Sequence, residues 1–413
     1  MTATAGPRDL RRRLAVLWLV VFVDLLGFGI LIPLIPFYGV RLGLSPEWVT
    51  LVISLHSLLQ FVGAPILGRL SDRFGRRSVL ALSMAGHAAA YALLAFADTV
   101  WLLVLSRLLS GFTSGNLAAA YAYVSDVTPA ERRAAGLARI SSAFALGFAL
   151  GPLLGGLLAG TGDPESASFA APAVAAASLS IVSLLGIALF LPESLRETSA
   201  AAIAATSARP ATSAGFATGR LHPLRDTALR WMVLLALGVL TFAAMRESLM
   251  SLWLHDELSF DTHTIGLVFT VNGLIVALTQ FTATGQLAQR FGELVTLRLG
   301  IVCYGLSWAG LLLAGSLHTV VLATATGAIG TAMFGTSLQS LVSQRAAPGE
   351  RGAVMGLYQS SASLARFGGA AFSGTLYARL GHDVPFTLGA IAMLPALVIT
   401  AMIAARLRHG EAR

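Results

Sequence analysis

Long apolar runs, separated by short polar segments, fill most of the chain. Each run approaches the roughly 20 residues that an α-helix needs to cross a bilayer. The twelve runs lie at residues 14–37, 47–67, 79–97, 100–124, 137–160, 168–191, 229–254, 263–285, 295–315, 318–342, 353–378 and 384–405. This pattern predicts an all-α membrane protein with twelve transmembrane helices. The first run is too long for the apolar part of a signal peptide and lacks an A-x-A-like site, so we interpret it as a retained helix.

Composition and charge support this interpretation. Hydrophobic residues make up 56% of the chain and charged residues 12%, and the mean hydropathy is +0.76, outside the usual range of soluble proteins. The chain contains no lysine. If both termini are cytoplasmic, Arg41 and Arg379 are the only arginines in the outer loops, as the positive-inside rule requires. Cytoplasmic loops facing anionic lipid then explain the net charge of +8, and no nucleic-acid partner is expected.

The chain contains an internal repeat. The stretch GRLSDRFGRRSVL at 68–80 returns, altered, as GQLAQRFGELVTL at 285–297, an offset of 217 residues. The repeat predicts two six-helix bundles, residues 1–195 and 229–413, joined by an Ala/Ser/Thr-rich cytoplasmic linker at 196–228. Duplicated halves of this kind commonly enclose a site near the bilayer midplane and alternate its access between the two sides.

The first copy resembles the loop between helices 2 and 3 of the major facilitator superfamily, and it lies between the second and third runs. The resemblance implies that the loop is a latch between the halves, with Asp72 as its pivot. Gln289 replaces this aspartate in the second copy, so we expect the latch to depend on the first half. A basic loop that only sets topology is the alternative. The gating residues are Gly68, Asp72, Arg73, Gly75, Arg76 and Arg77.

The fifth run carries GFALGPLLGGLL at 147–158, which resembles the antiporter motif of the same superfamily. Its glycines recur every four residues on one helix face, which allows close approach of a neighbouring backbone, and its proline favours a bend. The motif residues are Gly147, Gly151, Pro152, Gly155 and Gly156.

Two further sequence motifs point to one branch of this superfamily. LGFGILIPLIP at 26–36 resembles a helix 1 motif of twelve-helix drug and proton antiporters. LVLSRLLSGFTSG at 103–115 is similar to the helix 4 pattern of the family, with Arg107 retained and Ser110 in place of a glutamine. Together they resemble the tetracycline-efflux-like branch.

Ionisable residues inside apolar runs are costly in a bilayer and therefore indicate function. These are Asp24, Arg107, Arg246, Glu247 and Arg366. Helices 1, 4, 7 and 10 line the cavity of the superfamily fold, so Asp24, Arg107 and Glu247 could all face it. For proton coupling we predict Asp24 first and Glu247 second, with Arg107 tuning Asp24. Alternatively, Asp24 with Arg107, and Glu247 with Arg246 or Arg366, form permanent ion pairs, and Arg366 is expected to be structural.

The predicted substrate cavity combines charged and neutral polar residues. Each neutral residue could equally be hydrogen-bonded between helices, and His56 and His87 are expected to be packed and neutral. The cavity residues are Asp24, Asn116, Arg246, Glu247, Asn272 and Gln359. The sequence has no phosphate-binding loop and no Cys/His cluster with metal-ligand spacing, so we expect neither an enzyme, nor a metal, nor any cofactor beyond a coupling proton.

These features predict a secondary transporter of the bacterial inner membrane that exports lipophilic or drug-like molecules in exchange for protons. A proton-coupled metabolite exporter or symporter of the same fold is one alternative, and a receptor or scaffold that transports nothing is another. The expected partners are the lipid bilayer and a small-molecule substrate, and the family implies a monomer.

Overall fold

The computed structural model describes residues 7–128, 133–160, 169–194, 226–346 and 351–410. All regular elements of these segments are helices, so the predicted all-α class is confirmed. The first part of the chain forms α1 (Pro7–Leu31), α2 (Ile35–Arg41), α3 (Pro46–Phe74), α4 (Arg76–Ala95), α5 (Val100–Thr113), η1 (Ser114–Asn116), α6 (Leu117–Val127), α7 (Arg133–Ala159) and α8 (Ala170–Phe190). The second part forms α10 (Thr227–Leu258), α11 (Thr262–Thr279), η4 (Gln280–Thr284), α12 (Gly285–Phe291), α13 (Glu293–Leu312), α14 (Leu317–Arg345), α15 (Arg351–Leu380) and α16 (Val384–Gly410).

Each predicted run coincides with one helix or with a helix interrupted by a short break. Ten segments of the described chain are long and apolar enough to cross a membrane. The other two runs are helical but differ from the simple expectation: residues 100–124 break at η1, and α15, which is rich in glycine and serine, is long enough but not apolar enough. The number of transmembrane helices and the side on which the termini lie therefore stay predictions.

The break in the run 100–124 has a local cause. Side-chain hydroxyls bond back to carbonyls of the preceding turn, from Thr113 to Leu109 at 2.9 Å and from Ser114 to Ser110 at 2.8 Å. Such bonds compete with the helical ladder and bend helices. A Cβ on Gly115 would lie 2.7 Å from the Ala64 Cα atom, so a glycine is needed where the chain packs against α3. The sequence thus replaces a continuous helix by α5, η1 and α6.

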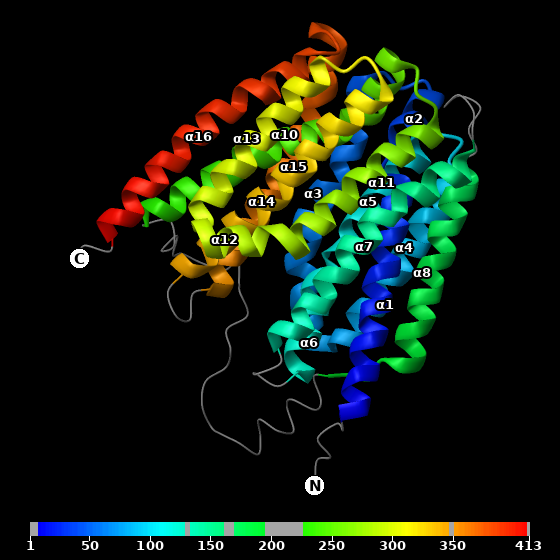
Figure 1. Ribbon diagram of the computed structural model, residues 1–413. Coiled ribbons are helices and arrows are strands. Elements are labelled where there is room, and N and C mark those ends of the chain that lie inside the picture. Colours follow the sequence, from blue (N-terminus) through cyan, green and yellow to red (C-terminus); the bar gives the residue numbers. More distant parts are fainter. Residues whose placement is uncertain (1–6, 129–132, 161–168, 195–225, 347–350, 411–413) are drawn as a thin grey trace.

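We call the described residues 7–194 the first half and residues 226–410 the second half. The two halves meet mainly where α3 packs on α15 and α7 on α11. Figure 1 shows the halves converging at the end away from the two chain termini and diverging at the end where the termini lie. Hydrogen bonds close the converging end, with the Gly374 amide donating to Thr50 Oγ1 at 3.0 Å and Thr262 Oγ1 donating to the Gly160 carbonyl at 2.9 Å.

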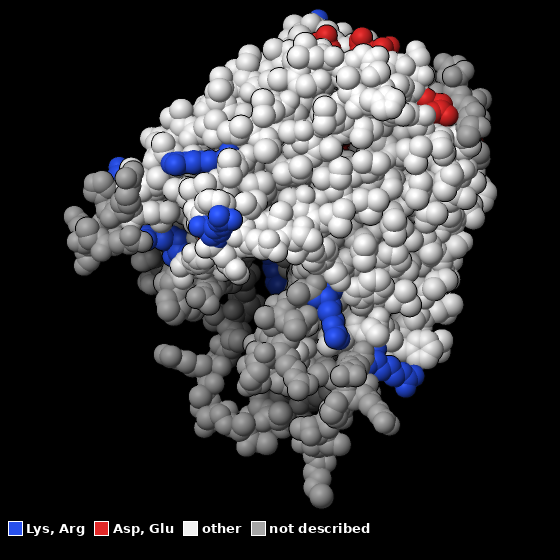
Figure 2. Space-filling model, viewed as in Figure 1, with Lys and Arg blue, Asp and Glu red and all other residues white. Residues whose placement is uncertain are grey.

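The buried apolar residues follow the same division. One large cluster joins both halves and includes Leu31 and Tyr38 of the first half and Trp253 and Trp308 of the second. A second cluster lies wholly within the first half near the termini, around Leu17. Figure 2 shows a hollow at the diverging end with a basic side chain inside it. The described structure is therefore closed at one end and open at the other.

The sequence repeat is also a structural repeat. Gly75 between α3 and α4 and Gly292 between α12 and α13 both have positive φ, 102° and 85°. Glycine adopts this conformation without the steric cost that a Cβ would add. The arginine before each turn lies over the following phenylalanine ring, Arg73 over Phe74 and Arg290 over Phe291. The predicted linker lies almost entirely outside the described residues, and the predicted half boundaries stay predictions.

Candidate functional site

Asp24 lies deep in the first half, near the middle of the apolar segment Arg12–Arg41. Its residue is only 8% exposed. Asn116 Nδ2 donates to Asp24 Oδ2 at 3.2 Å, and His87 Nδ1 lies 2.7 Å from Asp24 Oδ1. The second contact is close, but its angle is poor for a hydrogen bond. A membrane-embedded carboxylate is thus held between α4 and η1.

His87 is 2% exposed, and both of its ring nitrogens have polar neighbours. Its Nε2 atom lies 3.2 Å from the Ser110 carbonyl and 3.1 Å from Ser114 Oγ. Its ring stacks on Tyr91, one turn further along α4. From the sequence we expected this histidine to be packed and neutral, and its contact with Asp24 was not predicted. The signal was present, because a buried carboxylate needs a partner and the neighbouring runs contain few polar residues.

Arg107 does not pair with Asp24. No ion pair within 4 Å joins the two in the part of the chain that the structure describes, so the alternative of a permanent Asp24 and Arg107 pair is wrong for this conformation. Arg107 is 1% exposed, and its Nη2 donates to Ser106 Oγ at 3.1 Å, while its buried Nε has no hydrogen-bond partner. It is a nearly bare positive charge close to the site, since it interacts electrostatically with Tyr91 and Tyr38.

The glycine motif of α7 fixes α1, and so Asp24, at close range. A Cβ at Gly147 would lie 2.5 Å from the Phe22 carbonyl oxygen, and one at Gly155 would lie 2.1 Å from the Ile30 carbonyl oxygen. Gly151 likewise packs against Gly29. Two other motif residues face the second half, because Gly156 contacts Gly266 and the Pro152 carbonyl oxygen lies 2.8 Å from a Cβ built on Gly266. The motif therefore joins the Asp24 helix to the interface between the halves.

The second half holds its charges differently. Arg246 donates to Ser307 Oγ at 3.1 Å and lies over the rings of Tyr304 and Trp308. Glu247, the next residue of α10, is exposed. Among the described residues it has no hydrogen bond and no ion pair within 4 Å, so the alternative of a permanent pair with Arg246 or Arg366 is not realised.

Arg366 connects the halves near this carboxylate. Its Nη2 lies 3.1 Å from Ser363 Oγ in its own helix and 3.4 Å from Gln60 Oε1 in α3 of the first half. Arg366 and Arg246 both interact electrostatically with Glu247. Glu247 is therefore exposed on the inner side of α10, beside the second-half arginines, rather than isolated among lipid-facing residues.

The neutral cavity candidates separate into two kinds. Asn272 donates to the Thr324 carbonyl at 3.1 Å and so joins α11 to α14. Gln359 is exposed, and no hydrogen bond is found for it in the described segments. Asn272 is thus hydrogen-bonded between helices, which was the alternative to a place in the cavity. Gln359 keeps its polar atoms available to bind a ligand. The described residues hold no group of three or more potential metal ligands.

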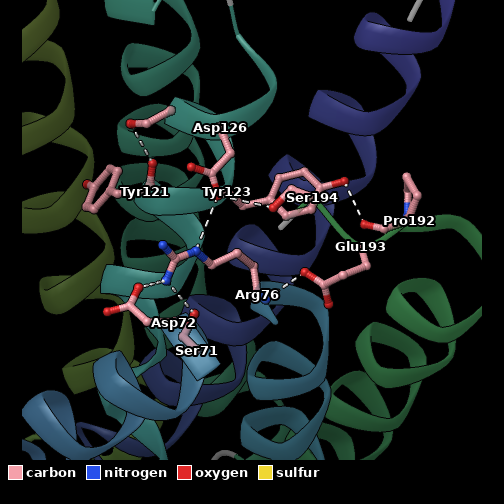
Figure 3. A network of polar contacts seen from close by, with 10 residues as sticks. Ser71, Asp72, Arg76, Tyr121, Tyr123, Asp126, Pro192, Glu193 and Ser194 are labelled. Carbon is pink, nitrogen blue, oxygen red and sulfur yellow. Dashed lines mark hydrogen bonds and ion pairs between the residues drawn. The ribbon is translucent and has the colours of Figure 1, made fainter. Parts of the chain in front are cut away.

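The predicted gating loop forms a polar network within the first half (Figure 3). Arg76 Nη1 lies 2.5 Å from Asp72 Oδ1, its Nε lies 3.3 Å from Asp126 Oδ2, and its backbone amide donates to Glu193 Oε1 at 2.8 Å. Arg77 Nη2 donates to the Ala188 carbonyl at 2.6 Å. Gly68 and Arg73 lie in the same α3 end, and Gly75 makes the turn. In this open conformation Asp72 thus binds its own half.

Comparison with known proteins now places the chain. The family model described as Major Facilitator Superfamily matches residues 17–255 and 235–413. The chain belongs to this superfamily. It is therefore a membrane transporter and not an enzyme, as the sequence predicted.

Its relatives confirm the resemblance to the tetracycline-efflux-like branch. The class G tetracycline resistance protein of Vibrio anguillarum is 30% identical over 361 residues, covering 85% of this chain and 86% of that protein. The class C tetracycline resistance protein of Escherichia coli is 29% identical over 376 residues, and the alignment covers 87% of this chain and 88% of that protein. The fold also resembles the crystal structure of the human organic anion transporter MFSD10, with a TM-score of 0.69 and 26% sequence identity. The aligned region covers 95% of this transporter and 99% of the MFSD10 chain.

Proposed function

We propose that this transporter exports lipophilic or drug-like small molecules in exchange for protons, by alternating access to a central site from the two sides of a bacterial inner membrane. The observation that carries the proposal is Asp24, a buried carboxylate beside a titratable histidine in the half that the glycine motif joins to the interface. A proton carrier needs a carboxylate whose charge depends on its surroundings. The arginine distribution favours cytoplasmic termini, and the open end would then face the cytoplasm.

Substrate would enter at the open end and meet polar groups of both halves. Glu247 and Gln359 supply accessible polar atoms, and Arg366 contributes a positive charge that bridges toward α3. Closing the open end and opening the hydrogen-bonded end would carry the substrate across. The names of the tetracycline resistance relatives favour an antibiotic or a molecule of similar size as the substrate.

A second candidate is export of an organic anion. It is favoured by the relationship to MFSD10 and by Arg246 and Arg366, two arginines beside the single accessible carboxylate Glu247 in this region of the described chain. Such a substrate would pair with an arginine rather than with Glu247.

The test is accumulation of tetracycline and of ethidium in bacteria that lack their own efflux pumps and express either the wild type or Asp24→Asn, each with and without a protonophore. We expect the wild type to lower accumulation, and we expect both the protonophore and the variant to abolish the effect at equal expression. An anionic dye tests the second candidate in the same cells. If tetracycline, ethidium and the anionic dye all accumulate as in cells without the protein, the proposed function is wrong.

A further inference from the structure

The contacts of His87 indicate which of its nitrogens carries a hydrogen. Nε2 has two neighbours, the Ser110 carbonyl and Ser114 Oγ. The carbonyl can only accept a hydrogen bond. The Ser114 hydroxyl hydrogen is already committed, because Ser114 Oγ donates to the Ser110 carbonyl at 2.8 Å. Both neighbours can act as acceptors toward His87, and the Ser110 carbonyl can act in no other way, so these contacts favour a hydrogen on Nε2.

The other nitrogen then determines the charge of the site. In neutral histidine only one ring nitrogen carries a hydrogen, so Nδ1 would present a lone pair to Asp24. Asp24 Oδ1 lies 2.7 Å from that nitrogen, and an ionised carboxylate is also an acceptor. Two acceptors at this distance repel each other in a site where both residues are buried. One further proton, on Nδ1 or on the Asp24 carboxyl, removes this repulsion, although the two atoms do not form a hydrogen bond in this structure.

We propose that Asp24 and His87 bind one shared proton, with His87 as the residue that positions this proton at Asp24. With the proton bound, the pair is neutral overall, either as carboxyl and imidazole or as carboxylate and imidazolium. Loss of that proton leaves a net negative pair with opposed lone pairs. The role of this proton as the coupling ion rests on the proposed function, whereas its presence does not.

The groups around the pair include few that titrate. Asn116 Nδ2 donates to the other Asp24 oxygen and so stabilises either form of the carboxyl group. The remaining titratable neighbours are Tyr91 on α4, Arg107 on α5 and His56 on α3, each linked electrostatically to the pair or to one another. The helix α8, which packs on both α1 and α4, has no titratable residue. The described surroundings thus offer no second carboxylate that could take this proton.

The pair also connects proton loss to movement. Asp24 belongs to α1 and His87 to α4, so a repulsive contact between them favours separation of these helices. The α1 helix is held by the glycine face of α7, which in turn packs on α11 of the second half. A shift of α1 is therefore transmitted to the interface between the halves. The proton-bound pair is the form that fits the conformation open at the end of the termini.

The first test needs no substrate. Protein labelled with ¹⁵N-histidine is placed in lipid nanodiscs near neutral pH, and the His87 signal is assigned as the one missing in His87→Gln. We expect either a doubly protonated ring, or an Nε2–H ring together with an infrared band of a protonated carboxyl that disappears in Asp24→Asn. A neutral Nε2–H ring without that band, or a ring with its hydrogen on Nδ1 alone, overturns the proposal. If His87→Gln does not fold, Asp24→Asn assigns the signal, because it changes the partner of His87 only.

The second test asks whether the pair couples transport. Inside-out vesicles accumulate tetracycline under a proton gradient and, separately, exchange it without one. We expect His87→Gln to lose gradient-driven accumulation by about tenfold or more while exchange is retained. The matched control is His56→Gln, which removes a buried histidine whose Nδ1 faces Ser110 Oγ rather than a carboxylate. Equal loss in both variants contradicts a special role for His87. Failure of the wild type to move tetracycline counts against the proposed substrate, and the first test still decides this inference.

Discussion

The two halves hold their membrane-embedded carboxylates in opposite ways. Asp24 in the first half is buried and bound between His87 and Asn116, whereas Glu247 in the second half is exposed and lacks a hydrogen bond or close ion pair among the described residues. A buried carboxylate is stabilised by a proton or a positive partner. An exposed carboxylate without a bound partner has polar atoms free to contact a ligand. Under the proposed function, this difference suits Asp24 to carry a proton and Glu247 to meet a substrate.

Near the chain termini, the two halves share a backbone turn but carry different polar groups. In the first half Arg76 contacts Asp126, while at the same offset in the second half Glu293 accepts from Gln344 at 2.9 Å. The glycine turns beside them, at Gly75 and Gly292, have the same sign of φ. Duplication thus preserved the backbone turn and exchanged the charges attached to it. Geometry shared by the halves is structural, and polar groups that differ are the better candidates for function.

The largest effect is expected where backbones touch. Gly155→Val would drive a side chain into the Ile30 carbonyl and force α1 and α7 apart. We expect destabilisation of about 3 kcal/mol or more, the upper range for overpacking, and loss of most folded protein. Size-exclusion profiles and melting of detergent-purified protein measure this. Gly186→Val is the control, because nothing lies within 4 Å of a Cβ at Gly186. Equal behaviour of the two variants would show that the close approach has no structural importance.

The next largest effect tests the difference between the two carboxylates directly. We expect Glu247→Gln to keep proton-driven export and to raise the ethidium concentration for half-maximal transport by up to about fivefold, as for loss of one accessible ion pair. Asp24→Asn is expected to lose the driven export and keep exchange. Initial rates in inside-out vesicles, over a range of ethidium concentrations, give both quantities. The reverse pattern, with coupling lost in Glu247→Gln alone, would assign the proton to the second half.

A smaller effect is expected at the polar network near the termini. Arg76→Gln removes contacts to Asp72 and Asp126, and hydrogen bonds to charged groups contribute about 1.5–3 kcal/mol each when they are protected from water. Because this site is partly exposed, we expect a melting temperature only a few degrees lower. Glu293→Gln should have less effect, since its partners Ser340 and Gln344 are neutral. A larger fall in melting temperature for Glu293→Gln than for Arg76→Gln would mean that the second-half network contributes more to stability.

Much of the helical structure was predictable because the length of an apolar run can be read directly from the sequence. The duplicated turns at Gly75 and Gly292 were also visible, since the glycines align in the repeat. The break at η1 was missed, because hydroxyls bond to carbonyls of their own helix without interrupting the apolar run. The partner of Asp24 was missed for a different reason: which of several polar residues meets it depends on helix rotation, and sequence spacing does not fix that rotation between separate helices.

The smallest effect is expected at the closed end, where Arg379 Nε lies 2.7 Å from Glu47 Oε1 across the two halves. Glu47 raises the pKa of Arg379, so this arginine stays protonated at any ordinary pH, and salt rather than pH tests the pair. The arginine side chain is 71% exposed, and exposed ion pairs contribute little. We expect Glu47→Gln to change the labelling rate of a cysteine placed at the open end by less than about twofold, and salt to remove the difference. The matched variant Thr50→Val removes the buried acceptor of the Gly374 amide in the same interface and should have the larger effect. If Glu47→Gln changes the labelling rate more than Thr50→Val does, the closed end depends on charge rather than on buried backbone contacts.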